Sequence, residues 1–264
     1  MPRYALLFLL LFGWFLATAQ SAGPYHFGTG RELAFGGAGA LTIGIGTILQ
    51  NNLAEPLRSE LSVPFYEDIN GFDRLGFNEE QGNARKISDY GLNFGAGLSA
   101  AFLLNRRTRR DIFRIGLLYA ETMALVGGIT NVTKASFGRA RPYVYGSNWD
   151  PAEPLRSGDR ASFLSGHTSL SAAGSFFFAR VFADYFPESR LRPFVWGLAA
   201  LVPATTGYLR IRAARHFPTD VLAGYALGAS LGILVPALHR RPVKDRRLGL
   251  AMSGSGFLVR YRLR

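Results

Sequence analysis

Cysteine is absent from the 264 residues of this chain, and histidine is scarce. The absence of cysteine excludes disulfides and thiolate metal sites, and it excludes every phosphatase, protease or transferase that uses a cysteine nucleophile. Any histidine chemistry must use His26, His167, His216 or His239. The sequence also shows no obvious cluster of carboxylates that would hold a metal ion.

Positive charge dominates, because 30 lysines and arginines stand against 18 aspartates and glutamates, a formal net charge of +12. Such a balance suits a nucleic acid, an anionic lipid or a phosphorylated substrate. The first residues argue against a nucleic acid. Arg3 precedes an apolar run over 5–16, and Ala17-Thr18-Ala19 has the form of a cleavage site, so we interpret residues 1–19 as a signal peptide or an uncleaved anchor. On either interpretation the next segment starts outside the cytoplasm.

Long apolar stretches rich in Gly, Ala and Leu follow, and they show little strict alternation, so helix is favoured over strand. They cover 33–49, 90–104, 112–130, 168–183, 192–208 and 221–238. We predict an all-α fold, a helical bundle of about five or six helices embedded in a membrane. A compact all-α protein in the periplasm, with its helices buried in one another, is the alternative.

The chain divides into four predicted parts. After residues 1–19, residues 20–89 form an N-terminal extramembrane segment that carries the Gly-rich apolar helix. Residues 90–240 form the helical bundle, and residues 241–264 form a basic tail with two short strands around Gly-Ser-Gly. When the apolar stretches are counted from 33–49, the second, the fourth and the last are each followed by a cluster of basic residues. The positive-inside bias puts all three clusters in the cytoplasm if 90–104 enters from outside, and with the signal segment removed this requires that 33–49 does not span.

Three short motifs carry the groups that could do chemistry. In KASFGRARP, Lys134 and Arg141 are seven residues apart and share one helix face, and Pro142 marks the helix end. Two cations at a helix end can grip one anion, although a basic rim facing lipid headgroups has the same pattern. In SFLSGHTSL, Ser165 is a plausible N-cap and Gly166 permits close approach of a ligand to the backbone.

Histidines complete the set. His167 stands at a helix N-terminus, where free N–H groups favour an anion, and it could donate a proton to a leaving oxygen. In YLRIRAARHFPTD, Arg210 precedes His216, and Asp220 follows four residues later, within reach of the imidazole. A carboxylate on one ring nitrogen leaves the other free to attack. All three motifs lie at helix ends on one side, which predicts a phosphoryl-transfer site.

In order and spacing the motifs K-x6-R-P, S-G-H and R-x5-H-x3-D resemble the signature of the type-2 phosphatidic acid phosphatase and vanadium haloperoxidase superfamily. The resemblance covers residues 90–240. Leu164 and Leu209 depart from it, because the family usually has Pro and Ser there. Neither change removes a charged group, so we expect activity to survive with an altered substrate preference.

The resemblance implies a metal-independent phosphatase that acts through a phosphohistidine. His216, held by Asp220, would attack phosphorus, and His167 would protonate the leaving group and then activate water. The implied phosphate-binding residues are Lys134, Arg141, Arg210, Ser165 and Gly166. We expect no metal, no cofactor and no nucleic-acid partner.

The expected substrate is a phosphorylated lipid or polyprenyl diphosphate, or a small phosphoester, and the expected location is a bacterial inner membrane with the site facing the periplasm. Candidates are phosphatidate, phosphatidylglycerol phosphate, undecaprenyl diphosphate and the phosphates of lipid A. A soluble periplasmic acid phosphatase is the main alternative. A vanadate-dependent haloperoxidase and a non-catalytic membrane protein that binds anionic lipid are further alternatives.

Overall fold

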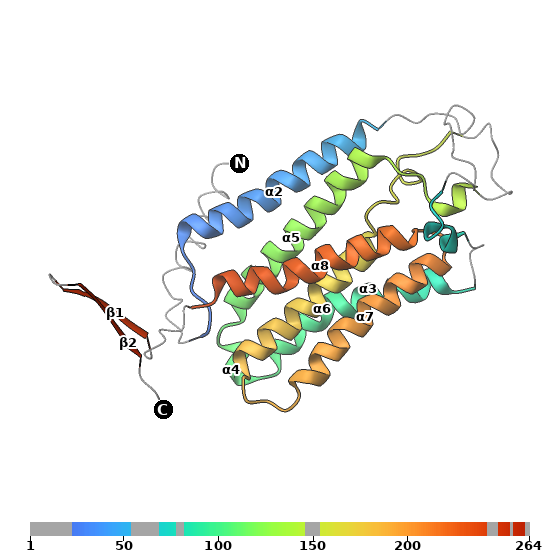
Figure 1. Cartoon of the computed structure of the whole chain (residues 1–264). Helices are drawn as coiled ribbons and strands as arrows, with labels where there is room; N and C mark the ends of the chain where they lie inside the picture. Colours follow the sequence, from blue (N-terminus) through green and yellow to red (C-terminus); the bar gives the residue numbers. More distant parts are fainter. Residues whose placement is uncertain are drawn as a thin grey trace, which may run out of the picture.

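The computed structural model describes residues 23–53, 69–77, 82–145, 154–241, 248–253 and 256–261, and most of them belong to a bundle of long helices (Figure 1). The long helices are α2 (Thr29–Asn51), α3 (Ala84–Gly97), α5 (Ile112–Phe137), α6 (Gly166–Tyr185), α7 (Arg192–Arg212) and α8 (Pro218–His239). The short helices are η2 (Asp73–Gly76), η3 (Leu98–Leu103), α4 (Arg106–Arg109) and η4 (Pro142–Tyr145). The predicted all-α bundle is confirmed, and the predicted signal segment lies outside the described residues.

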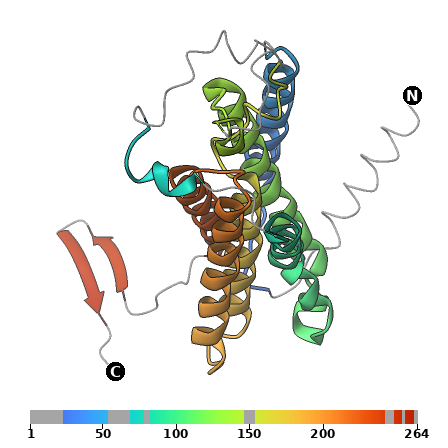
Figure 2. The same ribbon diagram turned by 90° about the vertical axis from the view of Figure 1, so that its right-hand side faces the viewer.

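The bundle has two ends, because successive helices run in opposite directions (Figure 2). At the end we call the site end, the Ser165 N–H at the start of α6 donates to the Asp220 carbonyl at the start of α8, 3.0 Å away. At the opposite end, which we call the far end, the Tyr185 hydroxyl at the close of α6 donates to Asp111 before α5, over 2.9 Å. One terminus of each long helix therefore lies at the site end.

Helix α6 is the centre of the bundle and contacts α3, α5, α7 and α8. Its Phe177 and Val181 are fully buried, together with Leu118 of α5 and Val235 of α8. This core fixes the helix ends that carry the polar motifs. After the bundle, β1 (Leu248–Ser253) and β2 (Gly256–Tyr261) pair as an antiparallel hairpin, as the sequence predicts for the tail.

Helix α2 packs along α5 in the same direction, and glycines make the approach close. A Cβ on Gly39 would lie 2.9 Å from Ala124, and one on Gly46 would lie 2.8 Å from the Asn131 Cβ. The sequence predicts that this apolar helix belongs to an extramembrane segment over 20–89, whereas in the structure it packs against α5 as part of the bundle. A boundary at residue 90 therefore does not describe the packing.

Within the described residues, four helices are long and apolar enough to cross a membrane. They are Thr29–Asn51, Ile112–Tyr145, Arg192–Arg212 and Pro218–His239. Large apolar side chains on them are exposed, such as Leu41, Leu201 and Leu234. Since such surface suits lipid better than water, the chain is a membrane protein.

The place of α2 affects the predicted orientation. The prediction that the basic loops are cytoplasmic required residues 33–49 not to span, yet α2 is one of the four candidate spans and begins at the far end with those loops. If α2 crosses the bilayer and the basic loops are cytoplasmic, α2 begins on the cytoplasmic side. An N-terminal segment that exports the residues after it is incompatible with that arrangement.

Candidate active site

The three sequence motifs lie together at the site end. Lys134 is in the last turn of α5, His167 is in the first turn of α6, and Arg210 is in the last turn of α7. His216 precedes α8, which begins with Pro218 at its first position. Lys134 and Arg210 both act electrostatically on the two imidazoles, so the histidines share one cationic surrounding.

His216 is buried and oriented through Nδ1. This nitrogen lies 2.7 Å from the carbonyl oxygen of Ser162 and 3.8 Å from Oδ2 of Asp220. Because a carbonyl accepts only, Nδ1 carries the proton and donates it, and Nε2 keeps its lone pair. Burial, together with the cations Arg141 and Lys134, lowers the pKa of His216 to about 3 although Asp220 opposes the shift, so the ring is neutral and able to act as a nucleophile.

The sequence predicts that Asp220 holds His216 directly, but in the structure the Ser162 carbonyl makes that hydrogen bond. Asp220 Oδ2 instead accepts hydrogen bonds from the Ser162 hydroxyl at 2.6 Å and from the Phe217 N–H at 2.8 Å. It therefore fixes the residue whose carbonyl holds His216 and the residue that follows His216. The carboxylate orients the imidazole through its neighbours and adds negative charge 3.8 Å from Nδ1.

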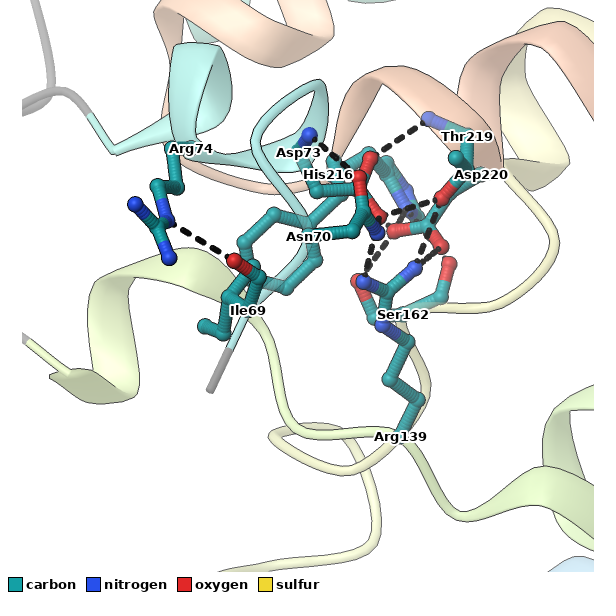
Figure 3. A network of polar contacts seen from close by, with 10 residues as sticks. Ile69, Asn70, Asp73, Arg74, Arg139, Ser162, His216, Thr219 and Asp220 are labelled. Carbon is teal, nitrogen blue, oxygen red and sulfur yellow. Dashed lines mark hydrogen bonds and ion pairs between the residues drawn. The ribbon is translucent and has the colours of Figure 1, made fainter. Parts of the chain in front are cut away.

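Asp220 belongs to a larger buried network (Figure 3). The guanidinium of Arg139 donates to Asp220 Oδ1 over 2.6 Å and to Asp73 Oδ2 over 2.8 Å, and it lies 4.2 Å above the Phe217 ring. Asp73 also accepts from the N–H and hydroxyl of Thr219. Arg139 thus connects the α5–α6 loop, α8 and η2. Neither Arg139 nor Asp73 is among the site residues that the sequence predicts.

His167 has a carboxylate partner that the sequence did not reveal. Its Nε2 lies 2.8 Å from Oδ1 of Asp89, on α3. The same oxygen is 3.8 Å from Nη1 of Arg210. Burial and the charges of Arg210 and Lys134 lower the pKa of His167 to about 4, and Asp89 opposes that shift. A bound anion that offsets the cations would raise the proton affinity of this ring.

The cations crowd together with donors left unpaired. Arg141, Arg210 and Arg215 each have a buried Nε that makes no hydrogen bond within the described part of the chain. Arg210 feels the charges of the other two. Buried donors without partners are costly, and so is repulsion between buried cations. Both costs disappear when a tetrahedral anion lies among them. Arg215, which also stacks 4.7 Å from the Tyr143 ring, was not among the predicted site residues.

Ser165 and Gly166 differ from each other in what they can offer an anion. Ser165 is at the N-cap position of α6, but its hydroxyl pairs with that of Thr168 at 2.9 Å and its N–H donates to the Asp220 carbonyl. The predicted use of the Ser165 N–H for phosphate is therefore wrong. Gly166 and His167 are the first residues of the helix, where the backbone N–H groups have no hydrogen-bond partner within the helix. A Cβ on Gly166 would lie 3.4 Å from Lys134 Nζ, so the backbone comes close to the cations.

Comparisons with known proteins agree with the motifs. Residues 115–244 match the family model of the PAP2 superfamily. A lipid A 1-phosphatase of Rhizobium etli is 33% identical over 130 residues, 48% of this chain and 51% of the relative. A lipid A 4′-phosphatase of Porphyromonas gingivalis is 27% identical over 144 residues, 52% of this chain and 58% of the relative. The chain spans about half the length of the curated relatives it matches.

Among solved structures, a transmembrane PAP2-type phosphatidylglycerolphosphate phosphatase from Bacillus subtilis aligns over 91% of this chain and 98% of its own, with 21% identity and a TM-score of 0.45. The family match is independent of that alignment and contains all three motifs, from Lys134 to Asp220. The part of the chain that carries the three motifs, residues 115–244, therefore belongs to the PAP2 superfamily.

Proposed function

We propose that this chain is a membrane phosphatase that hydrolyses a lipid phosphate or diphosphate, without a metal, through a phosphohistidine on His216. One observation carries the proposal. A neutral imidazole with a free Nε2 is buried beside clustered arginines whose buried Nε atoms have no hydrogen-bond partner among the described residues. That arrangement supplies a nucleophile and an oxyanion cradle without further reorganisation.

The proposed reaction has two displacements at phosphorus. Nε2 of His216 forms the bond to phosphorus as the bond to the leaving oxygen breaks. His167, which takes up a proton from solvent when the anionic phosphate offsets the nearby cations, gives the leaving oxygen that proton. Lys134, Arg141 and Arg210 hold the equatorial oxygens, and Arg does so through two donors where Lys acts as a point charge. Water then attacks the phosphohistidine and gives its proton to His167. Phosphate leaves, and both histidines return to their starting states.

A lipid substrate is supported by the surroundings of the site. Candidate spans end next to it, so a lipid whose chains stay in the bilayer can present its phosphate at the site end. Curated relatives named as lipid A phosphatases make the phosphates of lipid A the first substrates to test. A small soluble phosphoester is the alternative substrate.

The decisive assay measures phosphate release by the purified protein from a panel of lipid A, phosphatidate, phosphatidylglycerol phosphate, undecaprenyl diphosphate and p-nitrophenyl phosphate. We expect release that vanadate inhibits and that brief exposure to EDTA does not change. His216→Asn should abolish turnover, while His26→Asn, an exposed histidine at the far end, should leave it intact. Turnover by His216→Asn at the wild-type rate would refute the covalent route.

The site end faces the periplasm in this proposal, and the absence of cysteine makes the orientation easy to test. A single cysteine at Arg156, exposed near the site end, should react in whole cells with a maleimide that does not cross the inner membrane. A single cysteine at Glu188, exposed in the α6–α7 loop, should react only after the membrane is opened. The reverse pattern would put the site in the cytoplasm.

A further inference from the structure

A second cluster of titratable side chains lies at the far end of the bundle and takes no part in the proposed reaction. It consists of Glu32 in the first turn of α2, Glu121 in α5 and His239 in the last turn of α8. Along α8, His239 is 21 residues from Pro218, a rise of about 30 Å. The ligand atoms of the three side chains all lie within 4.8 Å of one another.

These groups face one another as acceptors. His239 Nδ1 donates to the Val235 carbonyl over 2.7 Å, which leaves the lone pair on Nε2. Nε2 then lies 3.2 Å from Glu32 Oε2 and 3.5 Å from Glu121 Oε2. His239 is fully buried and Glu121 is 3% exposed. The buried Oε2 of Glu121 makes no hydrogen bond to any residue that the structure describes.

Two carboxylates and an imidazole lone pair that converge in a buried space repel one another unless a cation lies between them. We propose that Glu32, Glu121 and His239 bind one divalent transition-metal ion, best matched by Zn²⁺. Imidazole nitrogen and carboxylate oxygen are both ligands that zinc binds in proteins. Tetrahedral bonds of about 2.0–2.1 Å place ligand atoms about 3.3 Å apart, close to the observed 3.2 and 3.5 Å.

The surroundings of the cluster have the form of an outer shell. A metal-binding histidine normally donates its second N–H to a carbonyl or carboxylate, as His239 does to Val235. The other carboxylate oxygen of Glu32 is fixed by the N–H of Gly28 at 3.1 Å and faces Nε of Arg31 at 3.5 Å. The three ligands leave the fourth tetrahedral position for water.

The ion would have a structural task, because it ties the start of α2, the middle of α5 and the end of α8 together. It lies away from the phosphate cradle, so this site and the metal-free catalysis proposed above stand or fall separately. Apparent stability, rather than phosphate release, should respond to zinc.

The test uses full-length protein in detergent, purified through an affinity tag without histidines. Metal analysis should find one zinc per chain in the wild type and in the control Glu188→Gln, an exposed carboxylate outside the cluster. Glu121→Gln, which keeps the size of the side chain, should lose the metal. Zinc returned to chelator-treated wild type should raise the Tm by several degrees, and Glu121→Gln should not respond.

Two results would overturn the proposal. One is wild-type protein whose zinc content, both before and after zinc is added, does not exceed that of Glu121→Gln. The other is Glu121→Gln with the same zinc content and Tm response as the wild type. Either would mean that a proton, shared within the cluster, offsets the repulsion between Glu32 and Glu121. If Glu121→Gln does not fold, His239→Gln replaces it in the comparison. If neither variant folds, the zinc content and the Tm response of the wild type alone test the proposal.

Discussion

Arg139→Met tests whether the buried network of Figure 3 supports the nucleophile. The guanidinium compensates two buried carboxylates, since Asp73 is 1% exposed and Asp220 is fully buried. Breaking a buried ion pair from one side costs about 3–5 kcal/mol. The lower end applies here, because Asp220 keeps its bonds from Ser162 and Phe217, and Asp73 keeps those from its other donors.

A loss of about 3 kcal/mol corresponds to a Tm lowered by about 6–12 °C for a chain of this size. Methionine preserves contact with the Phe217 ring, so the loss reports charge rather than packing. The Ser162 carbonyl that orients His216 also becomes less fixed, and kcat should fall about 10- to 100-fold. Thermal unfolding in detergent and initial rates of phosphate release measure the two effects.

Two controls sharpen this experiment. Arg156→Met removes an exposed arginine of the same α5–α6 connection and should change neither Tm nor kcat. Adding Asp73→Asn to Arg139→Met removes one of the two stranded charges and should restore about half of the lost stability. An Arg139→Met protein with wild-type Tm and kcat would show that the network does not support the site.

Three further predictions concern the ionisable groups of the site. Asp89→Asn removes the carboxylate that contacts His167. Because Asp89 is half-exposed, we expect the loss to be at the low end of the range for a charge-assisted hydrogen bond, about 5- to 10-fold in kcat with KM unchanged. A lower KM with intact kcat would instead mean that Asp89 competes with phosphate for the cations. Arg215→Gln should raise KM and weaken vanadate inhibition by about 10-fold, whereas Arg212→Gln should not, and equal effects would contradict a role for Arg215. The folded-state pKa of His216, about 3, lies below its ordinary 6.5, so the stability tied to the neutral ring is complete above pH 6.5 and declines as pH falls toward 3. At pH 5 the free energy of unfolding is lower by about 2 kcal/mol than at pH 7 through this group alone. His216→Asn should lack this part of the fall in Tm between pH 7 and pH 5. The same fall in both proteins would contradict the buried neutral imidazole.

The helical bundle and the meeting of its motifs follow from local sequence. Apolar helices that alternate in direction bring one terminus of each helix to the same end, so Lys134, His167 and His216 converge once the helices are recognised. The place of α2 could not be predicted in this way. Its packing depends on the close approach of Gly39 and Gly46 to the surface of α5, and the sequence of α2 alone does not indicate which helix it packs against.

The parts of the site that sequence missed come from tertiary contact. Asp73 and Asp89 belong to a polar stretch without a motif, and they meet Arg139 and His167 at separations of 66 and 78 residues. Ser165 shows the opposite error, since its N–H was expected at the phosphate and is used by Asp220. Likewise, Glu32 and His239 are 207 residues apart, so no carboxylate cluster was visible in the sequence.

The most direct test of the central claim is to trap the phosphorylated enzyme. His167→Asn protein mixed with ³²P-labelled phosphoester carrying a good leaving group should retain label, because water activation is lost while attack by His216 remains. The label should be labile in acid, stable in base, and located on the peptide that contains His216. The same experiment on His167→Asn/His216→Asn protein should give no label. Label that persists in the double variant, or its absence from His167→Asn protein that still turns over substrate, would contradict the phosphohistidine mechanism.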